Sequence, residues 1–221
     1  MGIRFDDAGA SATPATTDAV TGGSAVEVQA PGGGITLDLS KGVTLDLSKA
    51  EPGLKLVTLA AGWDVADTGA SFDIDISAFL LNTSKKIGSA ADIIYFRNMQ
   101  GTGIRLNGDN TTGEGEGDDE TIDIDLTKIP DQYTQIDFVV NIYDAMTKKQ
   151  TFGMVNSSYV RLLNKEAGDK EICRFSLKDE YSTSTAVIVA RLVRDGGNWK
   201  FETVGEGKVV KDLNDIAAIY S

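Results

Sequence analysis

The sequence predicts an all-β fold, a sandwich of two sheets with short helices and a C-terminal helix. Many short segments alternate apolar and polar residues with the period of two that a half-buried strand requires. Turn signals, such as the DGGN at residues 195–198, separate many of these segments. Long helical patterns are absent from the sequence before its last residues. This density of short strands is typical of a β-sandwich.

The composition changes at residue 35. Residues 1–34 contain few large apolar side chains, are rich in Ala, Thr, Ser and Gly, and end in APGGG. Such a composition is typical of a tail or linker, so we expect an N-terminal extension that is flexible or serves as a docking arm. Residues 35–221 then form one domain of ordinary size.

The first strands come from a tandem repeat. ITLDLSK at residues 35–41 is followed by VTLDLSK at residues 43–49, with Gly42 between them. Two copies are too few for a solenoid, so we expect paired or successive edge strands. Further strands are expected at residues 54–59, 71–81, 92–96, 120–126, 135–143, 158–163, 171–177, 185–194 and 198–204.

Two helices are expected. A short one follows Asp144 in the segment DAMTKKQ. At the C-terminus, apolar residues recur at helical spacing and form one stripe, which consists of Leu213, Ile216, Ala217 and Tyr220. Asp212 is placed to cap this helix at its N-terminus.

The overall composition excludes several classes of function. A formal net charge of −12 and a pI near 4.4 repel nucleic acid and anionic membrane surfaces, and no segment is long and apolar enough for membrane insertion. The chain has no His and a single Cys, Cys173, which excludes His-dependent triads, His-based zinc sites, thiolate metal clusters and internal disulfides. Cys173 lies in a strand-like segment, where a buried structural thiol is expected. The first residues, MGIRFD, lack the apolar core of a secretory signal, so we expect a cytoplasmic protein.

An acidic, glycine-rich segment is the most unusual feature of the sequence. GDNTTGEGEGDDE, residues 108–120, places six carboxylates within thirteen residues. Mutual repulsion and the flexibility of Gly leave such a loop disordered unless a cation holds it. The EF-hand pattern does not match, because Thr111, Gly113 and Glu114 occupy positions that require Asp or Asn, Asp or Asn, and Gly. We therefore favour a calcium site of another type, since Ca²⁺ takes six to eight oxygen ligands.

Two strands carry pairs of carboxylates. In FDIDIS, at residues 72–77, the alternation directs Asp73 and Asp75 to the face opposite Phe72, Ile74 and Ile76. ETIDIDL, at residues 120–126, repeats the pattern. A solvated polar face explains each carboxylate taken alone. Their combination with the acidic loop and with GWD at residues 62–64 favours metal ligation.

These motifs resemble the TerD family of tellurium-resistance and stress proteins. GLKLVTLAAGWDV, FDIDISAFLL, GDNTTGEGEGDDE, VNIYDA, QTFGMV and GNWKFETVGEG follow one another in the family's order, over residues 35–221. The resemblance implies a β-sandwich of the TerD type that binds Ca²⁺, usually as two nearby ions, and it carries no established enzymatic activity. The matching polar positions are Asp64, Asp73, Asp75, Asp109, Asn110, Glu114, Asp118, Asp119 and Glu120. The chain departs from the family pattern in its N-terminal extension and in LAAGWD, which replaces the more usual GLGWD.

Three functions follow from this resemblance and from the residues. The first is a non-catalytic Ca²⁺-binding domain that acts in tellurite or stress response as a scaffold ordered by metal. The second is a structural subunit of a virion or other large particle, which would bind a protein partner or itself through residues 1–49. The third, a hydrolase that uses Asp73 and Asp75 as an acid–base pair, lacks an accompanying nucleophile motif or phosphate loop.

Overall fold

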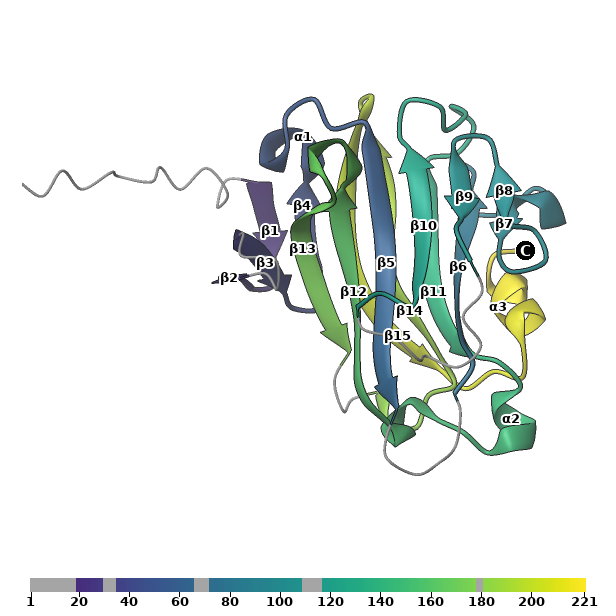
Figure 1. The fold of residues 1–221 in the computed structure, drawn as a ribbon. Coiled ribbons are helices and arrows are strands. Elements are labelled where there is room, and N and C mark those ends of the chain that lie inside the picture. Colours follow the sequence, from purple (N-terminus) through teal and green to yellow (C-terminus); the bar gives the residue numbers. More distant parts are fainter. Residues whose placement is uncertain (1–18, 30–34, 66–71, 109–116, 178–180) are drawn as a thin grey trace, which may run out of the picture.

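The computed structural model describes residues 19–29, 35–65, 72–108, 117–177 and 181–221. Two β-sheets pack face to face (Figure 1). One sheet has seven strands in the order β1-β4-β15-β14-β11-β6-β7, and the other has eight in the order β2-β3-β13-β12-β5-β10-β9-β8. The predicted all-β sandwich is confirmed.

The strands are β1 (Val20–Gly22), β2 (Ala25–Gln29), β3 (Ile35–Leu39), β4 (Val43–Asp46), β5 (Leu56–Val65), β6 (Ile74–Leu81), β7 (Ile93–Ile94), β8 (Gln100–Gly101), β9 (Ile104–Leu106), β10 (Glu120–Asp125), β11 (Gln135–Ile142), β12 (Val155–Asn164), β13 (Lys170–Leu177), β14 (Ala186–Asp195) and β15 (Asn198–Lys208). The α-helices are α1 (Leu47–Ala50), α2 (Ala145–Lys148) and α3 (Leu213–Ile219), and single 3-10 turns are η2 (Ala90–Asp92), η3 (Phe152–Met154) and η4 (Lys165–Ala167). Each strand predicted from alternation is present. The short strands β8 and β9 were not predicted.

The core lies between the two sheets and is built by the inward-facing residues of each strand. Ile122 and Ile124 of β10 are fully buried there, as are Ile74 and Ile76 of β6 and Phe138 of β11. Burying a side chain of this size stabilises the fold by roughly 1.5–3 kcal/mol. The alternation seen in the sequence therefore sets which face of each strand meets the core.

The two copies of the tandem repeat do not pair with each other. The first copy forms β3, which runs parallel to β13 in the eight-stranded sheet. The second forms β4, which pairs with β15 in the seven-stranded sheet. Leu39 of the first copy ends a strand, whereas its counterpart Leu47 begins α1, where the Asp46 carboxylate accepts a hydrogen bond from the Ser48 N–H. The expectation of edge strands is corrected, because β1 and β2 lie outside both copies.

Part of the predicted N-terminal extension belongs to the sandwich. Within residues 1–34, β1 pairs antiparallel with β4 and β2 pairs antiparallel with β3. Each sheet thereby gains one edge strand from this segment (Figure 1). Residues 1–18 and 30–34 lie outside the described part of the chain.

The two predicted helices, α2 and α3, are present, whereas α1 lies in a segment that was expected to be a strand. α3 packs on the outer face of the seven-stranded sheet, where Ile216 and Tyr220 join a second apolar cluster with Phe79 and Val139. The Tyr220 hydroxyl donates a hydrogen bond of 2.8 Å to the buried carboxylate of Asp137. Asp212 caps the helix, as predicted, by accepting from the Asn214 N–H. Among the described residues, no helix has the length and apolar character needed to cross a membrane.

Candidate metal site at one end of the sandwich

Three chain segments that carry predicted site residues meet at one end of the sandwich. β5 ends just beyond Asp64, β6 begins just after Asp73, and β10 begins at Glu120. β5 and β10 are antiparallel neighbours, and Glu120 lies opposite Ala61. The Glu120 carboxylate accepts a hydrogen bond of 2.8 Å from the Ile76 N–H, which links the start of β10 to β6 in the other sheet.

Asp119 lies against the end of β5. Its backbone N–H donates to the Ala61 carbonyl at 2.9 Å, and its carboxylate accepts from the Trp63 N–H at 2.9 Å. Burial raises the pKa of the Asp119 carboxyl. The nearby carboxylates of Asp64 and Asp118 raise this pKa further, against the opposing effect of the Trp63 hydrogen bond. A cation at this end would relieve the repulsion among these three carboxylates.

Glu120 is a buried carboxylate. It is only 2% exposed and shares the inward-facing side of β10 with Ile122 and Ile124. The Glu120 carboxylate accepts a hydrogen bond from the Ile76 N–H. Ile76 lies in the part of β6 that does not pair with β7, so Glu120 satisfies a backbone donor there. Glu120 thus ties the two sheets together at the base of the acidic segment.

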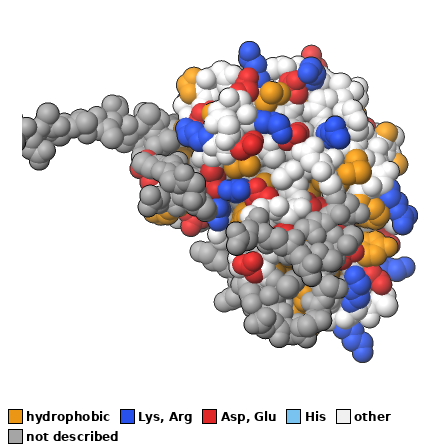
Figure 2. Space-filling model, in the orientation of Figure 1, with side chains coloured by type: hydrophobic (Ala, Val, Ile, Leu, Met, Phe, Trp, Pro, Cys, Tyr) orange, Lys and Arg blue, Asp and Glu red, His pale blue; other side chains and the backbone are white. Residues whose placement is uncertain are grey.

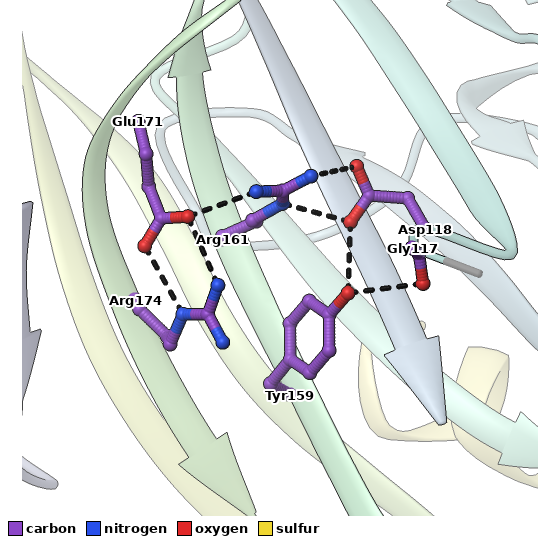
Figure 3. Close-up of polar contacts among 6 residues, drawn as sticks. All are labelled: Gly117, Asp118, Tyr159, Arg161, Glu171 and Arg174. Carbon is purple, nitrogen blue, oxygen red and sulfur yellow. Dashed lines mark hydrogen bonds and ion pairs between the residues drawn. The ribbon is translucent and has the colours of Figure 1, made fainter. Parts of the chain in front are cut away.

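Asp118 is held in a network on the eight-stranded sheet (Figure 3). Both of its carboxylate oxygens accept hydrogen bonds from the Arg161 guanidinium of β12, at 2.8 Å from Nε and 2.7 Å from Nη2. Arg161 also donates to Glu171 of β13 at 2.9 Å, and Arg174 donates twice to the same carboxylate. The Tyr159 hydroxyl lies 3.0 Å from the Gly117 carbonyl oxygen and 3.2 Å from the Asp118 carboxylate. The end of the acidic segment is therefore anchored by the bidentate ion pair between Asp118 and Arg161.

The charges in this network shift the pKa values of its members. Burial, together with the Asp118 charge and hydrogen bond, raises the pKa of Tyr159 to about 12. Burial opposes ionisation of Glu171, but the hydrogen bonds and charges of Arg174 and Arg161 outweigh it and hold the pKa of Glu171 below its usual value.

The glycine of the GWD motif makes room for this anchor. A Cβ added at Gly62 would lie 2.5 Å from the Tyr159 hydroxyl oxygen and 2.8 Å from the Gly117 carbonyl oxygen. Both distances are shorter than any side-chain carbon tolerates. Close approach of the Gly117 backbone to β5 therefore requires glycine at position 62.

Asp75 faces outward from β6, as the alternation predicted, and Asp73 directly precedes the strand. Phe72, Ile74 and Ile76 on the opposite side are buried in the core. Asp75 is nevertheless only 5% exposed, because it lies on the outer face of the seven-stranded sheet, where the Asn141 amide donates to it at 3.3 Å. Asp73 is half-buried, and its backbone carbonyl accepts from the Tyr143 N–H at 2.7 Å.

The described residues contain part of the predicted ligand set. Asp109, Asn110 and Glu114 lie outside them. Within the described ranges, no group of three or more His, Cys, Asp or Glu side chains has a spacing suited to one metal ion. The structure brings Asp64, Asp118 and Asp119 together, places Glu120 between the sheets, and places Asp75 on the outer face.

The donors at this end fit a hard cation. They are carboxylate and backbone oxygens, because the chain has no His and Cys173 is fully buried. Ca²⁺ prefers such ligands. Asp64 is exposed at the end of β5, whereas Asp118 has both oxygens committed to Arg161. Asp118 is therefore suited to positioning the acidic segment.

The anchoring residues were not predicted from the sequence. Arg161 lies 43 residues from Asp118, and no local motif joins them. The only signal is that Tyr159 and Arg161 occupy alternate positions of a strand and therefore share its outer face. Figure 2 views the molecule from the side of the eight-stranded sheet and shows Lys and Arg side chains interspersed with Asp and Glu. Pairs such as Lys165–Asp123 and Lys170–Glu51 contribute to this mixed surface.

Comparison with known proteins agrees with the fold and with the motifs. The family model described as the TerD domain matches residues 35–220. The chain is 41% identical over 176 residues to the tellurium resistance protein TerD of Serratia marcescens, covering 78% of this chain and 91% of that protein. It is 40% identical over 177 residues to general stress protein 16U of Bacillus subtilis, with the same coverage of both chains.

A solved structure shares the architecture. The crystal structure of a homologue of telluride resistance protein (TerD) from Streptomyces coelicolor A3(2) superimposes with a TM-score of 0.61. The superposition covers 76% of this chain and 99% of that chain at 19% identity, and it supports the fold alone. The family model covers the acidic segment, the GWD motif and every strand from β3 to β15. The chain belongs to the TerD family.

Proposed function

We propose that this protein is a non-catalytic, Ca²⁺-binding member of its family, which acts in the cytoplasm in tellurite or stress response as a scaffold ordered by metal. The observation that carries the proposal is the meeting of three carboxylate-bearing segments at one end of the sandwich. Asp64, Asp73 and Asp119 would ligate the ions there with Asp109, Asn110 and Glu114. Two ions would share so large a set of oxygen ligands.

Electrostatics supports a cation at this end. Burial raises the pKa of the Asp119 carboxyl, and the negative charges of Asp64 and Asp118 raise it further, even though Asp118 is paired with Arg161. A divalent ion turns this repulsion into attraction and so stabilises the folded state. The network of Arg161, Tyr159 and Glu171 would hold the acidic segment in place for the ion.

The absence of catalysis is also part of the proposal. Asp75 is buried beside Asn141, whose amide donates a hydrogen bond to its carboxylate, and the sequence offers no nucleophile motif or phosphate loop to accompany Asp73 and Asp75. The names of the relatives refer to tellurium resistance and general stress, which supports a role in those responses here.

Thermal unfolding in EDTA and in Ca²⁺ tests the proposal. A ligand at 100 times its Kd stabilises the folded state by about 2.7 kcal/mol. For a domain of this size, such a change raises Tm by about 5–10 °C. Mg²⁺ should stabilise less, because it requires a tighter octahedral shell. Identical melting curves in EDTA and in millimolar Ca²⁺ would refute calcium binding.

Matched variants test the proposed ligands. Asp119→Asn and Asp73→Asn remove charge with little change of shape and should weaken the calcium response. Asp131→Asn, whose side chain is fully exposed and remote from this end, should respond like the parent. If all three variants respond alike, the assignment of ligands is wrong.

A further inference from the structure

A cavity of about 690 Å³ lies on the outer face of the seven-stranded sheet. It is bordered by β6, β7 and β11, by α2, and by the start of α3, which appear together at the right of Figure 1. Its volume falls within the range typical of small-molecule sites. The cavity has an acidic floor and an aromatic wall, and neither is required by the core, which lies on the other face of the sheet.

The floor is formed by a cross-strand pair. Asp75 of β6 lies opposite Asn141 of β11, and the two side chains are only 5% and 9% exposed. The Asn141 amide nitrogen donates to Asp75 at 3.3 Å. Among the described residues, the Asn141 Oδ1 atom is buried and has no hydrogen-bond donor. A buried acceptor of this kind is unfavourable unless a donor is supplied.

The wall is a row of three aromatic rings. Tyr95 and Phe96 meet edge to face with centroids 5.4 Å apart, and Phe96 and Tyr143 do the same at 5.8 Å. Two of these rings already attract cations of the chain itself. Arg97 lies 5.3 Å from the Phe96 centroid, and Lys148 lies 5.5 Å from that of Tyr143. The wall therefore suits an apolar group and tolerates a positive charge.

We propose that this cavity binds a small organic amine in its ammonium form. The N–H donors would satisfy Asn141 Oδ1 and face the Asp75 carboxylate, while the apolar body would pack on Tyr95, Phe96 and Tyr143. The formal net charge of −12 favours the approach of a cation. An anion would meet the Asp75 charge. A bare metal ion would leave the aromatic wall without a partner, and the site is therefore separate in chemistry from the one proposed for calcium.

Binding of phenethylamine to the full chain tests this inference by calorimetry, in EDTA and again in Ca²⁺. Phenethyl alcohol, which is neutral, should bind at least tenfold more weakly, and phenylacetate should not bind detectably. Nα-acetyl-lysine methylamide distinguishes two sources of the ammonium group. If this probe binds more tightly than phenethylamine, the natural ligand is a lysine side chain of a protein. If it binds more weakly than phenethylamine, the natural ligand is a free amine. Both results support the proposed chemistry.

Variants of Asn141 locate the binding. Asn141→Leu removes the acceptor and should lower the affinity for phenethylamine at least tenfold, whereas Asn141→Asp should bind as tightly as the parent or more tightly. Asn198→Ala, at an exposed turn between β14 and β15, is the matched control and should bind normally. The calcium-dependent rise in Tm should persist in each variant and shows that the chain is folded.

Three results would overturn the inference. The first is equal binding of the alcohol and the amine, and the second is equal affinity of Asn141→Leu and Asn198→Ala. The third is displacement of phenethylamine by Ca²⁺ at the concentrations that raise Tm, which would make the cavity part of the calcium site. Loss of calcium stabilisation alone would refute the proposed function and leave amine binding intact.

Discussion

Replacing Arg161 with Met should destabilise the fold by about 3 kcal/mol. The substitution removes three hydrogen bonds, two to Asp118 and one to Glu171, and retains most of the apolar stem. Removing one partner of a buried ion pair costs about 3–5 kcal/mol. The lower end applies because the Arg161 side chain is 21% exposed and both carboxylates keep another partner, Tyr159 for Asp118 and Arg174 for Glu171. For a chain of this length, the Tm should fall by about 6–12 °C.

Urea unfolding in EDTA measures this loss without any contribution from metal. Lys165→Met is the matched control, because it removes an ion pair with Asp123 in which the two side chains are 43% and 27% exposed. Such a pair is worth less than about 1 kcal/mol. If the two variants lose the same stability, the network of Arg161 does not anchor the fold. The calcium affinity of Arg161→Met should also fall, since Asp118 then no longer positions the acidic segment.

Further predictions concern charge, backbone and chain length. The lowered pKa of Glu171 stabilises the fold above the unfolded value of about 4.3, and this contribution is lost as pH falls through the folded value. Parent and Glu171→Gln should therefore differ in urea stability at pH 6, and the difference should shrink steadily as pH falls below about 4.3. A difference that stays the same from pH 6 down through the acid range would contradict this. Gly62→Ala should lower both Tm and calcium affinity, because the added Cβ would clash with Tyr159 and Gly117. Gly108→Ala is the control and should leave Tm nearly unchanged, because a Cβ there meets open space. Equal effects of the two substitutions would rule out a clash at Gly62 as the cause. Deleting residues 1–34 should leave a folded, calcium-binding domain with a lower Tm, because β1 and β2 are lost. The docking-arm hypothesis predicts that the parent chain assembles in light scattering and that the truncated chain does not. A truncated chain that assembles as well as the parent would refute the hypothesis.

Alternation predicted most of the sandwich because burial of one face is a local property of a strand. β6 and β10 illustrate this, since their inward-facing isoleucines are fully buried. β1 and β2 were missed because VTG and AVEVQ resemble the small-residue segments around them, and only pairing with β4 and β3 makes them strands. The tandem repeat shows the same limit, because nearly identical sequences continue as a strand in one copy and as a helix in the other.

The candidate site was predictable in its composition and less so in its arrangement. The concentration of carboxylates in residues 108–120 indicated a cation. The commitment of Asp118 to Arg161 was not foreseeable, because β12 reaches the acidic segment through long-range pairing. Likewise, the sequence showed that Asp75 faces outward, but only the packing of α2 and α3 over that face makes its surroundings a cavity.

The order in which the chain visits the two sheets has a consequence for folding. The chain changes sheet after β1, β3, β4, β5, β7, β10, β11 and β13. Neither sheet is therefore a contiguous piece of sequence, and neither can form while the other part of the chain is still unfolded. Long-range pairing of this kind requires large loops to close before contacts stabilise them, which slows folding. We expect the two sheets to unfold together in one transition, so that a partially synthesised chain exposes its strands until β15 is complete.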